Sequence, residues 1–88
     1  MKKINKKILL VEDEETMRLY LKKLLASEGY DVEAVASGEE AIGLSPNGPF
    51  DLFILDLFLP GRDGLATLRL LRKRSPDAPS IIITAHGT

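Results

Sequence analysis

The sequence predicts an α/β fold in which three helices cover a parallel sheet of four strands. Short, continuous apolar runs, which are typical of buried strands, alternate with segments whose apolar residues recur at helical spacing. The series begins and ends with an expected strand. Breaks rich in glycine and proline separate these segments. Because strands that alternate with helices are joined by right-handed crossovers, we expect them to run parallel, with their carboxyl ends along one edge of the sheet.

Composition limits the classes of protein that this chain can form. The sequence has 88 residues and no cysteine, which allows one small domain without disulfides or thiolate metal ligands. A net charge of -1 argues against direct nucleic-acid binding, and the apolar runs are too short to cross a membrane. The basic start lacks the apolar region of a signal peptide. We therefore expect residues 1–88 to form one cytoplasmic domain.

The first strand is expected at Ile8–Val11, where four apolar residues precede the acidic residues 12–15. A helix follows, and Gly29 is suited to end it with a left-handed backbone. Glu14 and Arg18 have the spacing of a favourable i,i+4 ion pair on that helix. The residues expected to face the core recur at helical spacing and are Met17, Leu21, Leu24 and Leu25.

The second strand is expected between Tyr30 and Ala36. Acidic residues alternate with apolar ones along it, which is typical of an edge or half-exposed strand. Ser37 and Glu40 form the Ser-x-x-Glu pattern of a capping box and open a short helix through Leu44. The sequence Ser-Pro-Asn-Gly-Pro then breaks the chain.

The third strand is expected at Leu52–Leu55, an apolar run that leads directly into Asp56. A charge at the end of a buried strand is costly unless it is paired, bound to a metal or used chemically. The third helix is expected at about Gly64–Arg74, and Ile81–Ile83 is expected to form a fourth buried strand. The residues of the third helix expected to face inward are Leu65, Leu68 and Leu71.

Polar residues follow three of the expected strands: Glu12 and Asp13 the first, Asp56 the third and Thr84 the fourth. If these strands are neighbours, three carboxylates and one hydroxyl share a cleft. Clustered carboxylates repel one another, so the cleft either binds a hard cation, with magnesium the best match, or holds a proton at a raised pKa. Taken singly, Asp56 is equally well explained as a loop cap, and the acidic pair is better explained as helix-start residues than as metal ligands.

The same residues suggest a reaction. A carboxylate beside a magnesium ion can attack phosphorus, because the metal screens the repulsion between the attacking oxygen and the phosphoryl group. The hydroxyl of Thr84 is a suitable hydrogen-bond donor to a phosphoryl oxygen. Asp56 is therefore a candidate phosphoryl acceptor.

Three segments in this sequence carry a family resemblance. They are Ile8-Leu-Leu-Val-Glu12-Asp13-Glu, Asp56-Leu-Phe-Leu-Pro60-Gly61-Arg-Asp-Gly64 and Ile81-Ile-Ile-Thr84-Ala85-His86-Gly87. In their order and spacing they resemble the receiver domain of two-component response regulators. The resemblance implies a flavodoxin-like fold, with the strands present here in the order 2-1-3-4.

The resemblance also implies roles for individual residues. Asp56 would accept a phosphoryl group from a histidine kinase or a phosphotransfer protein, so the domain would be a phosphoacceptor in signal transduction rather than an enzyme. Asp13, Asp56 and the backbone carbonyl of Phe58 would bind Mg²⁺ directly, and Glu12 would act mainly through water. Thr84 would bind a phosphoryl oxygen and move on phosphorylation.

The match with the family is incomplete. Pro60 and Gly61 would support the loop after the acceptor, but no residue here matches the lysine that ends the family's fifth strand. Lys73 lies in a helix and cannot replace it. We therefore expect a receiver domain truncated after its fourth strand, with weakened phosphorylation. Its open edge at Ile81–Ile83 is expected to pair with a second copy or to exchange elements with it.

Two alternatives compete with this interpretation. The first is a structural or dimerising receiver fragment that binds magnesium but does not switch. The second is an aspartate-nucleophile phosphatase of the haloacid dehalogenase type. That family has an acidic residue two positions after the nucleophile, where this sequence has Phe58, so we set the phosphatase aside.

Overall fold

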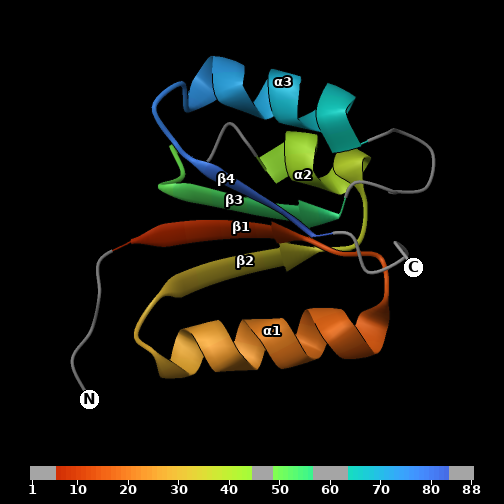
Figure 1. Cartoon of the computed structure of the whole chain (residues 1–88), viewed down its shortest axis with the longest axis vertical. Coiled ribbons are helices and arrows are strands. Elements are labelled where there is room, and N and C mark those ends of the chain that lie inside the picture. Colours follow the sequence, from red (N-terminus) through yellow and green to blue (C-terminus); the bar gives the residue numbers. More distant parts are fainter. Residues whose placement is uncertain (1–5, 45–48, 57–63, 84–88) are drawn as a thin grey trace.

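A parallel sheet forms the centre of the protein, and the computed structural model describes residues 6–44, 49–56 and 64–83. Within these ranges, the strands are β1 (Lys7–Val11), β2 (Asp31–Val35), β3 (Leu52–Asp56) and β4 (Ser80–Ile83). The helices are α1 (Glu15–Ser27), α2 (Gly38–Leu44) and α3 (Gly64–Arg74). The strands lie in the order β2-β1-β3-β4, and all neighbours are parallel, which confirms the predicted fold (Figure 1).

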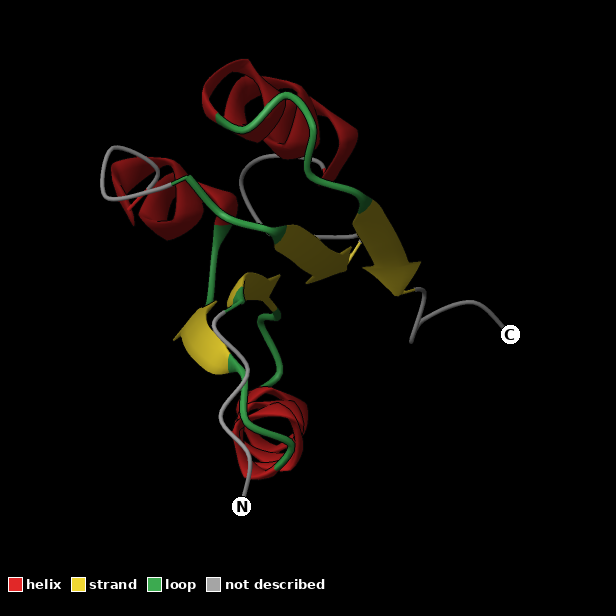
Figure 2. Cartoon of the chain, turned by 90° about the vertical axis from the view of Figure 1, so that its left-hand side faces the viewer, coloured by secondary structure: helices red, strands yellow, loops and turns green. Residues whose placement is uncertain are grey.

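Helices cover both faces of the sheet, with α1 on one side and α2 and α3 on the other (Figure 2). Side chains alternate between the two faces along each strand. Ile8 and Leu10 of β1 therefore join the core that includes residues of α1. Leu9 and Val11 join the core that includes residues of α2 and α3. Because β1 and β3 are buried on both faces, their sequences are continuous apolar runs.

The register of the sheet brings the carboxyl ends of the strands together. Val11 at the end of β1 pairs with Val35 of β2 and with Leu55 of β3. Asp56 at the end of β3 pairs with Ile83 of β4. The residues that directly follow β1 consequently lie beside Asp56, as the sequence predicted for neighbouring strands.

Helix α1 begins and ends with specific backbone interactions. The Glu14 carboxylate caps its start by accepting hydrogen bonds from the backbone N–H groups of Thr16 at 3.2 Å and Met17 at 2.8 Å. Gly29 follows the helix with a φ of 100°, a left-handed conformation that residues with a Cβ adopt at a cost. The predicted helix stop is therefore confirmed.

The predicted core face of α1 is only half right. Leu21 and Leu25 pack against the core, whereas Met17 and Leu24 are 37% and 46% exposed. The cause is the narrow contact between α1 and the sheet. The helix packs mainly against β2, so only the part of its apolar stripe that points at the sheet is covered.

The capping box of α2 forms with a small shift. The Ser37 hydroxyl accepts a hydrogen bond from the Glu40 backbone N–H at 3.2 Å, as the Ser-x-x-Glu pattern predicts. The Glu40 carboxylate accepts from the backbone N–H of Ala36 at 3.1 Å, one residue before the expected donor. Both interactions still fix the turn between β2 and α2.

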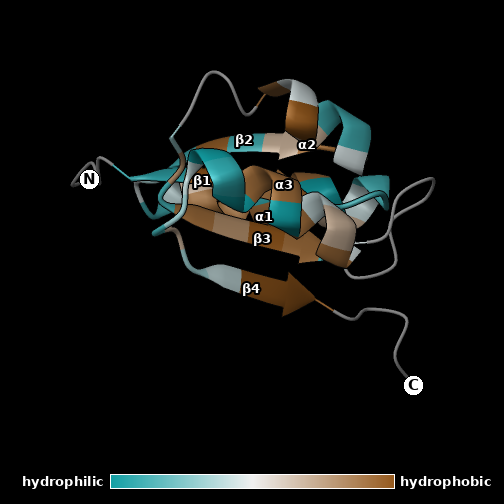
Figure 3. Ribbon diagram, turned by 90° about the horizontal axis from the view of Figure 1, so that it is seen from above, coloured by the Kyte–Doolittle hydropathy of each residue, from teal (hydrophilic) through white to brown (hydrophobic). Residues whose placement is uncertain are grey.

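Two expectations about buried residues in the second half of the chain are wrong. Leu65 of α3 was expected to face the core but is 52% exposed, whereas Thr67 is buried. Residues two apart on a helix point about 200° apart, so Thr67 and Leu65 cannot both face the core. In β4, Ile81 and Ile82 are 51% and 38% exposed, because this strand lies at the margin of the described sheet (Figure 3).

Two glycines, Gly29 directly after α1 and Gly43 within α2, give a test of this backbone description. Gly29→Ala should lower the free energy of unfolding by about 1–2 kcal/mol, because alanine is strained at a left-handed φ. Gly43→Ala, in α2, should raise it by about 0.5–1 kcal/mol, since no atom lies within 4 Å of the added Cβ. Urea unfolding followed by circular dichroism measures both changes, and equal effects of the same sign would contradict the assigned conformations.

Candidate functional site

Three carboxylates meet at the carboxyl edge of the sheet. Glu12 and Asp13 follow β1, and Asp56 ends β3; each offers an oxygen, and these oxygens lie within 4.8 Å of one another. Glu12 and Asp56 are buried and Asp13 is half-buried. The pairing of Val11 with Leu55 makes the cluster, because it aligns the ends of the two strands. The structure thus brings together the three acidic residues that the strand order was expected to gather.

Hydrogen bonds to the backbone hold the turn between β1 and α1. The Glu12 N–H donates to the Val35 carbonyl of β2 at 3.0 Å. The Glu14 N–H donates to Glu12 Oε2 at 3.1 Å. Arg18 of α1 donates from Nη1 to the carbonyl of Glu12 at 3.0 Å and to that of Asp13 at 3.5 Å. The acidic pair is therefore anchored to a strand and to a helix.

Electrostatics make this cluster costly without a compensating charge. Burial raises the pKa of Glu12 above its ordinary value, and the neighbouring Asp13 and Asp56 raise it further, while the hydrogen bond from Glu14 acts in the opposite direction. Within the part of the chain that the structure describes, Glu12 Oε1 and Asp13 Oδ1 are buried and accept no hydrogen bond. Since buried polar atoms are nearly always paired, these two oxygens call for a cation or a proton.

The donor set fits a magnesium ion. Carboxylate oxygens are hard ligands, and magnesium binds one or two of them directly while it keeps several waters. The oxygens of the three carboxylates lie within 4.8 Å of one another, so a single ion between them would reach more than one carboxylate.

The other residues expected at this site lie outside the described residues; they are Phe58, Pro60, Gly61 and Thr84. The backbone ligand, the loop support and the phosphoryl-binding hydroxyl assigned to them therefore stay predictions.

Arg18 is the residue at this site whose role the sequence did not indicate. Its spacing from Glu14 predicted an ion pair, but the Glu14 carboxylate caps α1 and the guanidinium turns to the carbonyls before the helix. The i,i+4 spacing predicts contacts only between side chains on the same helix. The carbonyls of Glu12 and Asp13 belong to the turn before α1, and the path of this turn brings them within reach of Arg18.

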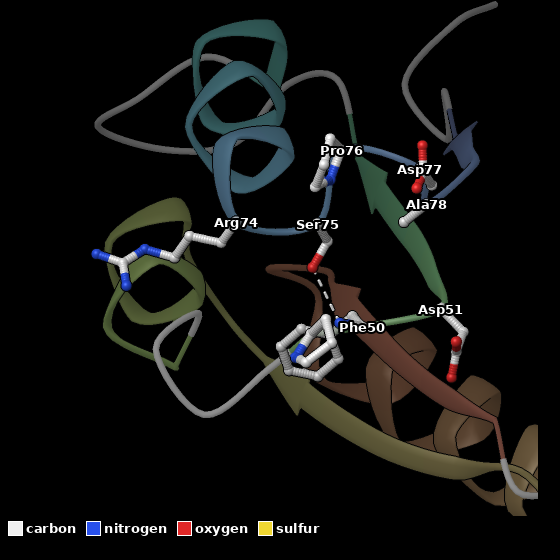
Figure 4. A pocket seen from close by; sticks show the side chains of 8 residues that line it. Phe50, Asp51, Arg74, Ser75, Pro76, Asp77 and Ala78 are labelled. Atoms are coloured by element: carbon white, nitrogen blue, oxygen red, sulfur yellow. Dashed lines mark hydrogen bonds between the residues drawn. The ribbon is translucent and has the colours of Figure 1, made fainter.

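A pocket of about 410 Å³ lies at the opposite edge of the sheet, between the start of β3 and the turn from α3 to β4 (Figure 4). Two of its polar residues have structural partners. The Ser75 hydroxyl accepts a hydrogen bond from the Phe50 backbone N–H at 3.0 Å. Asp51 Oδ2 accepts one from the Lys7 backbone N–H at 2.8 Å. These two bonds join the starts of β1 and β3 and the turn after α3. Because the polar groups of the pocket serve the fold in this way, the carboxylate cluster is the stronger candidate for a functional site.

Comparison with known proteins identifies the family. The profile described as the response regulator receiver domain matches residues 8–88. The transcriptional regulatory protein TcrA of Mycobacterium tuberculosis is 38% identical over 81 residues, which cover 92% of this chain and 32% of TcrA. The chain thus spans about a third of the length of this curated relative.

Two solved structures of one bacterial protein extend the comparison. The response regulator TrrA of Thermotoga maritima, solved in complex with Mg²⁺-BeF, is 42% identical with a TM-score of 0.81, covering 91% of this chain and 70% of that chain. TrrA in complex with the histidine kinase ThkA is 41% identical with a TM-score of 0.81, covering 94% and 72% respectively. Sequence, topology and relatives agree, and this chain belongs to the receiver domain family of two-component response regulators.

Proposed function

We propose that this receiver domain accepts a phosphoryl group on Asp56 from a phosphohistidine of a sensor kinase or a phosphotransfer protein. The observation that carries the proposal is the position of Asp56. Its carboxylate ends a buried central strand and lies within 4.8 Å of oxygens from two further acidic residues. A structural loop cap needs no such neighbours, whereas phosphoryl transfer to a carboxylate needs a nearby cation site.

The transfer exchanges one bond to phosphorus for another. A carboxylate oxygen of Asp56 attacks the phosphorus atom and forms a P–O bond as the P–N bond to the histidine breaks. The electron pair of that bond goes to the imidazole nitrogen. The histidine leaves as a neutral imidazole if its other ring nitrogen carries a proton, and otherwise it takes up a proton from solvent. The product is an aspartyl phosphate on this chain and a free histidine on the donor.

The residues at the edge of the sheet would prepare this step. Asp13 and Asp56, with the backbone carbonyl of Phe58, would hold Mg²⁺ directly, and Glu12 would act through water. When bound, the ion would withdraw charge from the phosphoryl oxygens as the anionic nucleophile approaches. The fixed turn after β1 would keep the acidic pair in place, and Thr84 would donate to a phosphoryl oxygen.

The partner and the setting follow from the same proposal. The similarity to TrrA, which was solved with the histidine kinase ThkA, supports a histidine kinase as the donor. Because Asp56 is itself modified, the domain is a phosphoacceptor and not an enzyme acting on an external substrate. Among the described residues, no helix has the length and apolar character needed to cross a membrane. We place the reaction in the cytoplasm, a reducing compartment compatible with the absence of cysteine.

A second candidate function has its own supporting observation. Ile81 and Ile82 are exposed on β4, and a strand at the edge of a sheet can pair with another chain. The domain would then be a self-associating unit that binds magnesium without switching. In this case the carboxylate cluster would serve folding and metal binding, and Asp56 would stay unmodified.

Phosphorylation distinguishes the two candidates. With acetyl phosphate and Mg²⁺, the chain should gain the mass of one phosphoryl group, detected by intact-mass spectrometry. Asp56→Asn should abolish the gain, because an amide oxygen is a poor nucleophile. Asp51→Asn, directly before the start of β3, is the matched control and should leave the gain unchanged. If the unaltered chain stays unmodified while it still binds Mg²⁺, the second candidate is favoured.

Self-association has a separate test. If the β4 edge pairs two copies, light scattering should show a mass that rises with protein concentration. Ile81→Lys should reduce this rise, since a charged side chain on an edge strand opposes pairing with another strand. A monomer at all concentrations in the unaltered chain would exclude this edge as a contact between copies.

The raised pKa of Glu12 predicts how stability depends on pH without metal. In the folded chain Glu12 holds its proton above the reference pKa of 4.5, so the folded state binds more protons than the unfolded state. Its contribution to stability is therefore full below about pH 4.5 and is lost as pH rises through the folded-state pKa.

Glu12→Gln measures this contribution, because it removes the titration and keeps the shape of the side chain. In EDTA, the urea midpoint of the unaltered chain should fall, relative to that of the variant, as pH rises above about 4.5. Adding Mg²⁺ at neutral pH should raise the midpoint of the unaltered chain. Parallel pH profiles of the two proteins would show that Glu12 is not buried at a raised pKa.

A further inference from the structure

We propose that Arg18 is a positioning residue for the metal site, and this inference rests on the proposed function. Helix α1 begins beside the carboxyl ends of β1 and β3, which places its first turn next to the acidic turn (Figure 1). From that turn, the half-buried Arg18 guanidinium donates to the carbonyl of Glu12 at 3.0 Å and reaches that of Asp13 at 3.5 Å. One side chain thus contacts the main chain of both acidic residues.

These contacts restrict the directions of the acidic side chains. A carbonyl group and the adjacent Cα–Cβ bonds share the same backbone dihedral angles, so fixing two successive carbonyls leaves those bonds little freedom. The Glu12 N–H is fixed from the other side by the Val35 carbonyl at 3.0 Å. Arg18 and β2 together hold the turn in one conformation, with its carboxylates near Asp56.

The choice of carbonyls as acceptors matters for the metal. A guanidinium usually pairs with a carboxylate, often through two parallel hydrogen bonds, and would then compete with a cation for the same oxygens. Here the guanidinium donates to main-chain oxygens, while Glu12 Oε1 and Asp13 Oδ1 accept no hydrogen bond from the described residues. Arg18 therefore orders the acidic turn without occupying the oxygens that would bind the ion.

An effect of the Arg18 charge and an effect of its positioning role would change the affinity for Mg²⁺ in opposite directions when Arg18 is removed. A positive charge close to the cluster opposes the binding of a second cation, so its loss should strengthen Mg²⁺ binding if charge alone counts. If Arg18 positions the turn, its loss should weaken Mg²⁺ binding by about ten-fold or more, as residues that orient metal ligands do. The sign of the change decides between the two roles.

The experiment compares Arg18→Met, Arg18→Lys and the control Lys22→Met. Lys22 is exposed one turn further along α1, so its replacement removes the same charge without touching the acidic turn. Isothermal titration calorimetry with Mg²⁺ gives the affinity, and the urea midpoint with and without Mg²⁺ gives the metal-linked stabilisation. We expect weakened binding for Arg18→Met, smaller weakening for Arg18→Lys, and unchanged or slightly stronger binding for Lys22→Met.

The outcomes separate a failure of this inference from a failure of the proposed function. Wild-type affinity or tighter binding in Arg18→Met would overturn the positioning role, and so would a loss of metal-free stability with unchanged affinity. If Arg18→Met does not fold, Arg18→Lys decides, because it keeps the charge and loses the planar donor group. If the unaltered chain binds no Mg²⁺, or if Asp13→Asn binds it equally well, the proposed metal site fails and the inference falls with it.

Discussion

The pairing of β1 with β3 is the constraint on which the site depends. Both strands are buried on two faces, and their parallel register ends them side by side, so Asp56 and the acidic residues after β1 are forced into proximity. Burying carboxylates next to one another is unfavourable unless a cation or a proton compensates them. The pairing of β1 with β3 thus builds the core and also places the three carboxylates side by side. The free energy gained by burying the core offsets the repulsion between these carboxylates.

Much of this arrangement could be predicted from the sequence. Continuous apolar runs marked β1 and β3 as central strands, and the acidic residues at the ends of these runs marked the edge with the candidate site. Parallel topology supplies the rest, because it places all carboxyl strand ends on one side. The family resemblance added the strand order, which periodicity alone does not give.

The errors have a common physical origin in packing between elements. Helical periodicity identified the apolar stripe of α1, but which half of the stripe is covered depends on where the helix lies across the sheet. Met17 and Leu24 are exposed for that reason. Thr67 is buried where Leu65 was expected, because the rotation of α3 is set by its neighbours and not by its own sequence. Arg18 shows the same limit, since its acceptors belong to a turn outside its helix.

We propose that Asp56 is a nucleophile toward phosphorus and that a metal site lies beside it. A crystal structure of the chain with Mg²⁺ and beryllofluoride would test it most directly, because beryllofluoride mimics a phosphoryl group bonded to a carboxylate. We expect beryllium bonded to a carboxylate oxygen of Asp56, with Mg²⁺ held by Asp13 and Asp56. Beryllofluoride bound at another residue, or Mg²⁺ in the cluster without beryllofluoride on Asp56, would contradict it.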